Sequence, residues 1–103
     1  MTTLKYTNTV FITGCSTGIG RALALACLER GDLVFATARK IESLNDIEHE
    51  RLVPIALDVN DDAAIAKAMA IVTERVHHID LLVNNAGYAA MGPVLELSHD
   101  KLL

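Results

Sequence analysis

The stretch TGCSTGIG, Thr13 to Gly20, follows directly on an apolar run at residues 10–12 and contains three glycines but no lysine. Where a strand passes into a helix, glycines in such a loop have separate purposes. Gly14 permits the sharp turn off the strand, Gly18 lets a diphosphate approach the backbone, and Gly20 lets the helix pack closely on the sheet. The N–H groups and the dipole at the start of the helix attract an anion. The stretch therefore predicts a phosphate-binding turn between a strand and a helix.

Two other glycine motifs that bind phosphate do not fit this stretch. The P-loop pattern GxxxxGK[ST] would need glycine at Ile19 and lysine at Gly20. The GxGxxG pattern starting at Gly18 fails because Leu23 stands where glycine or alanine is expected. What remains is the pattern TGxxxGxG.

Apolar runs and helical patterns alternate along the rest of the chain. We expect strands, each a short and largely apolar run, at Thr9–Ile12, Leu33–Ala38, Leu52–Leu57 and Asp80–Asn84. We expect helices from the glycine loop to Arg30, over Lys40–Glu50, from Asp61 onward, and from an N-cap at Ser98. Gly31 is a suitable residue to end the first helix, because glycine readily adopts the left-handed conformation found there.

Each expected helix has apolar residues at helical spacing. They are Ile19, Leu23 and Cys27 in the first, Ile41, Leu44 and Ile47 in the weaker second, and Ile65, Met69, Val72 and Val76 in the third. Because the strands are continuous apolar runs, both faces of their sheet should be covered. The order predicts an α/β fold, a Rossmann-type doubly wound parallel sheet. We expect an incomplete sheet of about four strands with three crossover helices, forming one partial domain over residues 1–103.

Composition limits the classes of function. The 103 residues are 51% hydrophobic and 21% charged, with a net charge of -4. This balance predicts a buried core and argues against nucleic acid or an anionic membrane surface as a partner. No apolar run approaches the ~18 residues of a membrane span, and the first residues lack the apolar region of a signal peptide. We therefore expect a cytoplasmic protein with reduced thiols, and no metal site, because Cys15 and Cys27 have no histidine at metal-ligand spacing.

Three motifs together resemble the short-chain dehydrogenase/reductase family, in its classical branch. Thr13–Gly20 matches the family's cofactor motif, and Asn84-Asn85-Ala86-Gly87 matches its NNAG segment after the fourth strand. Asp58-Val59, after the third strand, matches the pair that contacts the adenine ring in the family. The details TGCSTGIGRALA and VFATAR are most similar to a subgroup with acyldihydroxyacetone-phosphate reductases and hydroxysteroid dehydrogenase-like enzymes.

The resemblance implies a set of cofactor-binding residues. Apart from Arg39, treated below, they are Gly14, Ser16, Thr17, Gly18, Ile19, Gly20, Asp58, Val59, Asn85, Ala86 and Gly87. Plainer interpretations stay open for some of them. Asp58 could accept backbone hydrogen bonds at a strand end, Asn84 and Asn85 could form a turn, and Ser16 and Thr17 could fill the loop. The NNAG segment also helps to hold the family's sheet together.

The residues after the second strand indicate which nicotinamide cofactor is used. A free ribose 2′-hydroxyl calls for an acid there, about 20 residues after the loop, but the sequence is ATARK, Ala36 to Lys40. Arg39 offers a planar fork that suits a 2′-phosphate, and Lys40 adds charge. The alternative is a surface arginine at the start of a helix. We expect NADP(H).

The family's chemistry uses a tyrosine, a lysine four residues later, a serine and an assisting asparagine. Only Tyr6 and Tyr88 are present, and Val10 and Gly92 follow them at that spacing, so we name no catalytic residue. The resemblance implies hydride transfer between NADP(H) and a small carbonyl or alcohol substrate, and an oligomer is possible for a full-length protein. We expect this chain to be an inactive fragment of such an oxidoreductase. A non-catalytic nucleotide-binding half-domain and a truncated, inactive gene product remain alternatives.

Overall fold

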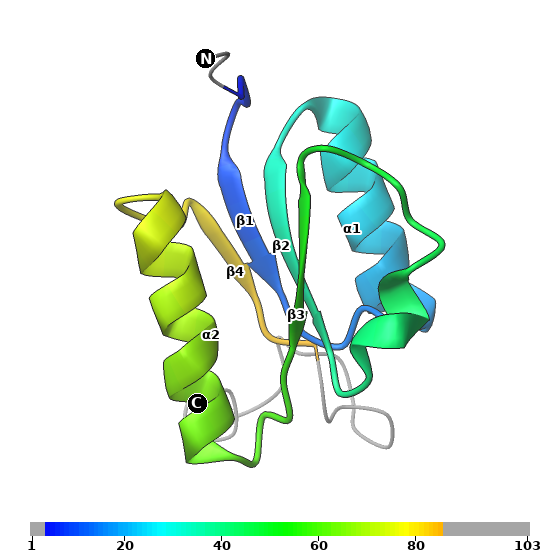
Figure 1. Ribbon diagram of the computed structural model, residues 1–103. Helices are drawn as coiled ribbons and strands as arrows, with labels where there is room; N and C mark the ends of the chain where they lie inside the picture. The colour runs from blue at the N-terminus through cyan, green and yellow to red at the C-terminus, as the bar shows by residue number, and fades with distance from the viewer. Residues whose placement is uncertain (1–3, 86–103) are drawn as a thin grey trace, which may run out of the picture.

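The computed structural model describes residues 4–85, which form an α/β unit (Figure 1). Its elements, in chain order, are β1 (Thr9–Ile12), α1 (Gly18–Arg30), β2 (Leu33–Ala38), the 3-10 helix η1 (Ile41–Leu44), β3 (Leu52–Ala56), α2 (Asp62–Arg75) and β4 (Leu81–Val83). The predicted strands are confirmed, with β1 and β2 at the expected bounds and β3 and β4 one or two residues shorter. The predicted helix from Ser98 lies outside the described residues.

The four strands form one parallel sheet in the order β3-β2-β1-β4. Phe11 of β1 pairs with Phe35 of β2 on one side and with Leu82 of β4 on the other. Because side chains alternate across a strand, β1 and β2 contribute to a core on each face. Val10 and Val34 pack in the cluster that contains residues of α1, whereas Phe35 packs in the cluster that contains residues of α2. The doubly wound arrangement is confirmed, and Figure 1 shows the two helices flanking the sheet.

Helix α1 packs on the sheet through small residues. Gly20, Ala24, Cys27 and Leu28 are its buried positions. The expected stripe was wrong at Ile19, which is 71% exposed, because the packed face is centred on Gly20 and Ala24, which allow a close approach to the sheet. Gly31 ends the helix as predicted, with φ 101° and an N–H that donates to the carbonyls of Cys27 and Leu28.

Helix α2 begins with a side-chain cap and touches the sheet along a narrow face. The Asp61 carboxylate accepts hydrogen bonds from the N–H groups of Ala63 and Ala64, at 3.0 and 3.2 Å. Ala68 and Val72 are buried. Of the expected core positions, Val72 and Val76 are buried, whereas Ile65 and Met69 are each 37% exposed. The expected stripe was therefore only partly correct.

The predicted helix over Lys40–Glu50 was wrong, since only the four-residue η1 forms there. Two local features oppose a longer helix. The Ser43 hydroxyl donates to the carbonyl of Lys40 at 2.7 Å, which competes with helical pairing, and Asn45 and Asp46 favour turns. Leu44 alone is fully buried in this segment, and it anchors η1 to the α1 side of the sheet. Between the four strands of residues 4–85, the chain therefore has two α-helices and one 3-10 turn in place of the three expected helices.

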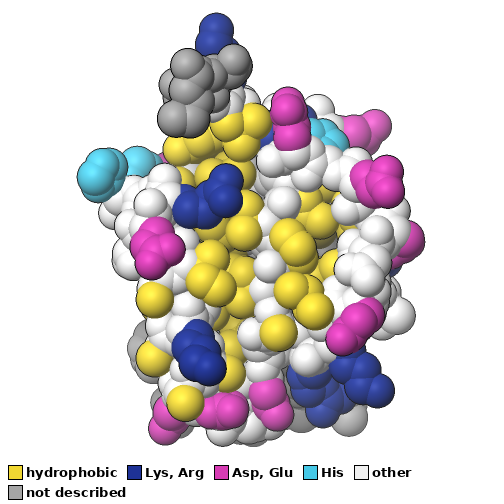
Figure 2. Space-filling model, viewed as in Figure 1, with side chains coloured by type: hydrophobic (Ala, Val, Ile, Leu, Met, Phe, Trp, Pro, Cys, Tyr) yellow, Lys and Arg dark blue, Asp and Glu magenta, His cyan; other side chains and the backbone are white. Residues whose placement is uncertain are grey.

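The two outer strands differ in how they end the sheet. The backbone hydrogen bonds from Val34 N to Arg51 O and from Leu57 N to Ala38 O show the orientation of β3. The backbone N–H and C=O groups of its odd-numbered residues face β2, and those of its even-numbered residues face away from the sheet. Pro54 therefore lies at an outward position, where its missing N–H blocks further pairing. The β4 edge has no such residue, and Leu81 and Leu82 are 42% and 60% exposed. Figure 2 shows further hydrophobic side chains on the face that carries β3.

Candidate functional site at the carboxyl edge of the sheet

The glycine loop has the backbone conformation that its glycines predict. Gly14 has φ 69° and Gly18 has φ 64°, both in the left-handed region that L side chains rarely adopt. Thr17 is extended and makes no side-chain cap hydrogen bond to α1. The first N–H groups of the helix are therefore not occupied by a side-chain cap, and they are available to an anion.

Gly20 is required by packing. A Cβ atom at this position would overlap the carbonyl oxygen of Gly14 and would lie 2.7 Å from the Asn85 amide nitrogen. A Cβ on Gly18, in contrast, would meet no atom within 4 Å. Gly20 therefore brings the helix against the loop, whereas Gly18 leaves the loop open on its outer side, where a diphosphate could approach.

Asn85 joins the end of β4 to the glycine loop. Its backbone N–H donates to Thr13 Oγ1 at 2.9 Å, and its side-chain amide donates to the carbonyl of Gly14 at 3.2 Å. The Thr13 N–H in turn donates to the carbonyl of Val83 at 3.0 Å. These bonds support a structural role for this part of the NNAG segment. Ala86 and Gly87, the other predicted residues of that segment, lie outside the described residues.

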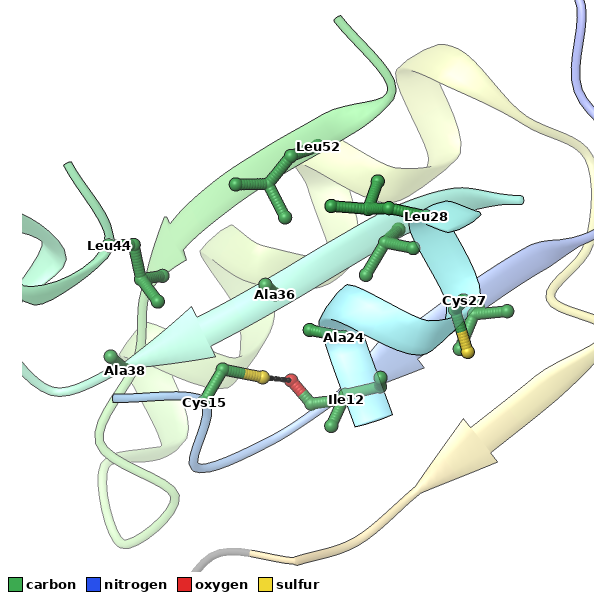
Figure 3. Close-up of a cluster of buried hydrophobic side chains, with 11 residues drawn as sticks. Ile12, Cys15, Ala24, Cys27, Leu28, Ala36, Ala38, Leu44 and Leu52 are labelled. Atoms are coloured by element: carbon green, nitrogen blue, oxygen red, sulfur yellow. Dashed lines mark hydrogen bonds between the residues drawn. The ribbon is translucent and has the colours of Figure 1, made fainter. Parts of the chain in front are cut away.

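Between Gly14 and Gly20, one loop side chain is buried and the others face solvent. Cys15 is fully buried, and its thiol donates to the carbonyl of Ile12 at 3.2 Å (Figure 3). Burial raises the pKa of the Cys15 thiol to about 11, although a backbone hydrogen bond with Thr37 acts in the opposite direction. Ser16, Thr17 and Ile19, all predicted to bind cofactor, are exposed on the outside of the loop.

Arg39 is exposed immediately after β2. The end of that strand is fixed by the hydrogen bond from Leu57 N to the carbonyl of Ala38, at 2.9 Å. Within residues 4–85 the Arg39 guanidinium has neither a hydrogen bond nor an ion pair, so its donors are free for a ligand. In Figure 2, Lys and Arg side chains gather at the lower right of the face, over the end of β2 and η1.

Asp58 and Val59 follow β3. The Asp58 carboxylate accepts a hydrogen bond from the N–H of Asn60 at 2.9 Å, and its carbonyl accepts one from Asp61. The carboxylate thus stabilises its own turn, as the plainer interpretation of this residue expects. Asp58 is nevertheless exposed, with a second carboxylate oxygen for which no hydrogen bond is found in the described chain. Val59 is half-buried against the α2-side core.

Parallel strands bring these loops together. All four strands point the same way, so the segments after β1, β2, β3 and β4 lie at the carboxyl edge of the sheet, where open α/β sheets bind ligands. The open glycine loop suits a diphosphate, and the free Arg39 guanidinium suits a further phosphate. The residues present therefore fit a phosphorylated dinucleotide. Among residues 4–85, no cluster of three or more His, Cys, Asp or Glu side chains could hold a metal ion.

Sequence reasoning missed Arg21 at this edge. Its guanidinium lies in the first turn of α1 and pairs with the Asp46 carboxylate, which belongs to the segment after η1. The signal available in the sequence was a basic residue near a helix N-terminus, where the helix dipole disfavours a cation.

A family model described as short chain dehydrogenase matches residues 8–103. The chain belongs to the short-chain dehydrogenase family. Oxidoreductase BOA17 of Botryotinia fuckeliana is 44% identical over 94 residues, which are 87% of this chain and 34% of that protein. The NADP-dependent 3-hydroxy acid dehydrogenase YdfG of Salmonella typhi is 39% identical over 83 residues, which are 78% of this chain and 34% of that protein. The chain thus spans about a third of the length of these relatives.

Solved structures of the short-chain dehydrogenase family share the fold. A short-chain dehydrogenase from Streptomyces avermitilis has a TM-score of 0.74 and 42% identity, over 78% of this chain and 30% of that one. A short chain dehydrogenase from Burkholderia cenocepacia, in complex with NADP, has a TM-score of 0.71 and 38% identity, over 93% of this chain and 38% of that one. In the part of the chain that the structure describes, no helix has the length and apolar character to cross a membrane.

Proposed function

We propose that this chain binds NADP(H), as the cofactor-binding part of an oxidoreductase that transfers hydride between NADP(H) and a small carbonyl or alcohol substrate. The observation that carries the proposal is the exposed, unpaired guanidinium of Arg39 at the same sheet edge as the open glycine loop. Residues 1–103 would then form one partial cofactor-binding domain. The NADP named or bound in two of the similar proteins supports the same cofactor here.

Different residues of the chain would bind different parts of the cofactor. The loop from Gly14 to Gly20 would hold the diphosphate against the start of α1, and Arg39 would hold the 2′-phosphate with two charge-assisted hydrogen bonds. Asp58 and Val59 would lie beside the adenine ring. The bound nicotinamide supplies or accepts the hydride, and the protein part described here binds and orients it.

The preference for NADP(H) over NAD(H) follows from the strength of the arginine contact. Hydrogen bonds to charged groups contribute about 1.5–3 kcal/mol, which corresponds to roughly ten- to a hundredfold in affinity. Titration of the 103-residue chain with NADPH and with NADH, followed by cofactor fluorescence or calorimetry, measures this ratio. Arg39→Ala should weaken NADPH binding by about tenfold or more and change NADH binding little.

Arg75→Ala is a matched control, because it removes the same charge from the last turn of α2, at the opposite edge of the sheet. It should leave both dissociation constants unchanged. Equal affinity for NADPH and NADH in the unmodified chain would overturn the assignment of NADP(H). An equal loss of NADPH affinity in Arg75→Ala would show that the effect of Arg39→Ala comes from the net charge of the chain and not from a specific contact.

Catalysis is tested separately from binding. The sequence has no Tyr-x-x-x-Lys, so the chain by itself should bind cofactor without turnover. NADPH oxidation with a panel of small aldehydes and ketones should stay at the rate of the protein-free control. Turnover above that rate would show that the chain has a catalytic group we have not recognised.

A further inference from the structure

Arg21 connects the first turn of α1 to the segment that follows β2. Its Nη2 is paired with the Asp46 carboxylate, and its Nη1 donates to the carbonyl of Ser43 at 3.4 Å. The Arg21 side chain is 25% exposed, whereas that of Asp46 is 68% exposed. Because the planar guanidinium binds a carboxylate and a backbone carbonyl together, it fixes both the orientation and the distance of this segment relative to α1.

The contact reaches Arg39 through a short chain of hydrogen bonds. Ser43 donates to the carbonyl of Lys40 twice, from its hydroxyl at 2.7 Å and from its N–H at 3.0 Å. On the other side of Arg39, the carbonyl of Ala38 is held by the N–H of Leu57. Arg39 thus lies between two anchored points, one in the sheet and one that depends on Arg21.

The two arginines near this edge differ in what they can bind. The guanidinium of Arg21 is already paired with Asp46, so its charge is largely neutralised. A cation in the first turn of a helix is also unfavourable against the helix dipole, and the Asp46 carboxylate offsets this cost. Arg39 has no such partner among residues 4–85. Arg21 is therefore suited to hold the segment in place, and Arg39 is suited to bind.

We infer that Arg21 is a positioning residue for cofactor choice: its bonds to Asp46 and Ser43 hold Arg39 at the distance from the glycine loop that a 2′-phosphate requires. The inference rests on the proposed binding of NADP(H). Bidentate binding of a phosphate tolerates little displacement of the arginine backbone. Because α1 carries both Arg21 and one end of the phosphate-binding loop, a single side chain couples the two phosphate subsites.

The test compares Arg21→Gln, Asp46→Asn and their double variant in NADPH and NADH titrations of the 103-residue chain. Each single variant should lower the preference for NADPH over NADH by about 1.5- to fivefold, the range of one partly exposed ion pair. The double variant should lose no more than either single variant, because both remove one interaction. Arg21→Lys should restore part of the preference, since lysine can pair with Asp46.

Glu42→Gln is the matched control for Asp46→Asn. It removes a negative charge from η1 without touching Arg21, so it should leave the preference unchanged or raise it slightly. Hydrogen exchange in the cofactor-free chain gives a second measurement. The amides of Asn45 and Ile47, which donate to Glu42 and Leu44, should exchange faster in Arg21→Gln and Asp46→Asn and at the original rate in Glu42→Gln.

The sign of the Asp46→Asn result separates the inference from its main rival. If Arg21 binds a phosphate directly, removing Asp46 would free its guanidinium and would tighten NADPH binding, which would overturn the positioning role. If Arg39→Ala abolishes the preference but Arg21→Gln and Asp46→Asn keep it, the inference fails and the proposed function stands. If Arg39→Ala has no effect, the proposed function fails first. Should Arg21→Gln not fold, the exposed Asp46→Asn substitution still decides the question.

Discussion

Asp80 and Thr9, 71 residues apart in the sequence, are held together by a carboxylate and a hydroxyl where β1 and β4 begin. The Asp80 Oδ2 accepts hydrogen bonds from the Thr9 N–H at 2.7 Å and from the Thr9 hydroxyl at 3.0 Å. These bonds, together with the nearby His78, lower the pKa of the Asp80 carboxyl from its usual 3.8. A side-chain contact therefore sets where the edge strand β4 meets the rest of the sheet.

This contact predicts a dependence of stability on pH. Because the pKa of Asp80 is lower in the folded chain, its contribution is present above its unfolded pKa and is lost as the pH falls through its folded pKa. Asp80→Asn keeps the shape and removes the charge. Its Tm should be below that of the unmodified chain at pH 7, and the difference should shrink as the pH falls below 3.8. A Tm difference that does not vary with pH would contradict this.

The contact between Gly20 and Gly14 predicts a large effect from a single methyl group. Gly20→Ala should destabilise the fold by about 1–3 kcal/mol or prevent folding, because the new Cβ would overlap the Gly14 carbonyl, which also accepts a hydrogen bond from Asn85. Gly18→Ala has free space and only its positive φ to oppose it, which costs about 1–2 kcal/mol. Urea unfolding of the two variants should rank Gly20→Ala as the less stable. The reverse order would mean that α1 can move away from the loop.

The burial of Cys15 predicts an unreactive thiol. With a pKa of about 11, only about a thousandth of the Cys15 thiol is ionised at pH 8, and the thiolate is the reactive form. Iodoacetamide should therefore modify Cys15 slowly in the native chain at pH 8, and quickly in urea. Peptide mapping after timed labelling measures this. Rapid native labelling of Cys15 would show that the loop opens, and would make the loop sensitive to thiol reagents.

The exposed edge at β4 predicts a tendency to associate. Leu82 is 60% exposed and lies on an outer strand without the protection that Pro54 gives to β3. Leu82→Lys should raise the monomeric fraction in size-exclusion chromatography and leave the Tm nearly unchanged, since charged residues at a sheet edge oppose strand pairing. Leu25→Lys, at a residue of α1 that is 43% exposed, is the control and should change the monomeric fraction less. An equal increase in the monomeric fraction for both variants would mean that association depends on exposed hydrophobic side chains in general and not on the β4 edge.

The parts of the fold that the sequence predicted correctly are those with strong local signals. The bounds of β1 and β2 follow from continuous apolar runs, and both strands are wholly buried. The end of α1 follows from Gly31, and the loop conformation follows from Gly14 and Gly18, because glycine adopts a positive φ at little cost. The predicted binding roles of Ser16, Thr17, Asp58 and Arg39 stay predictions, with all four side chains exposed at the expected edge.

The sequence by itself determined the alternation of strands and helices, the turn at the glycine loop and the family, because each depends on residues close together in the chain. The tertiary structure decided which face of α1 is buried, why Gly20 has no room for a side chain, and that Cys15 points inward. It also brought Arg21 to Asp46 and Asn85 to Gly14. Arg21 and Asp46 are separated by 25 positions in the sequence, and Asn85 and Gly14 by 71. No local sequence pattern specifies contacts over such separations.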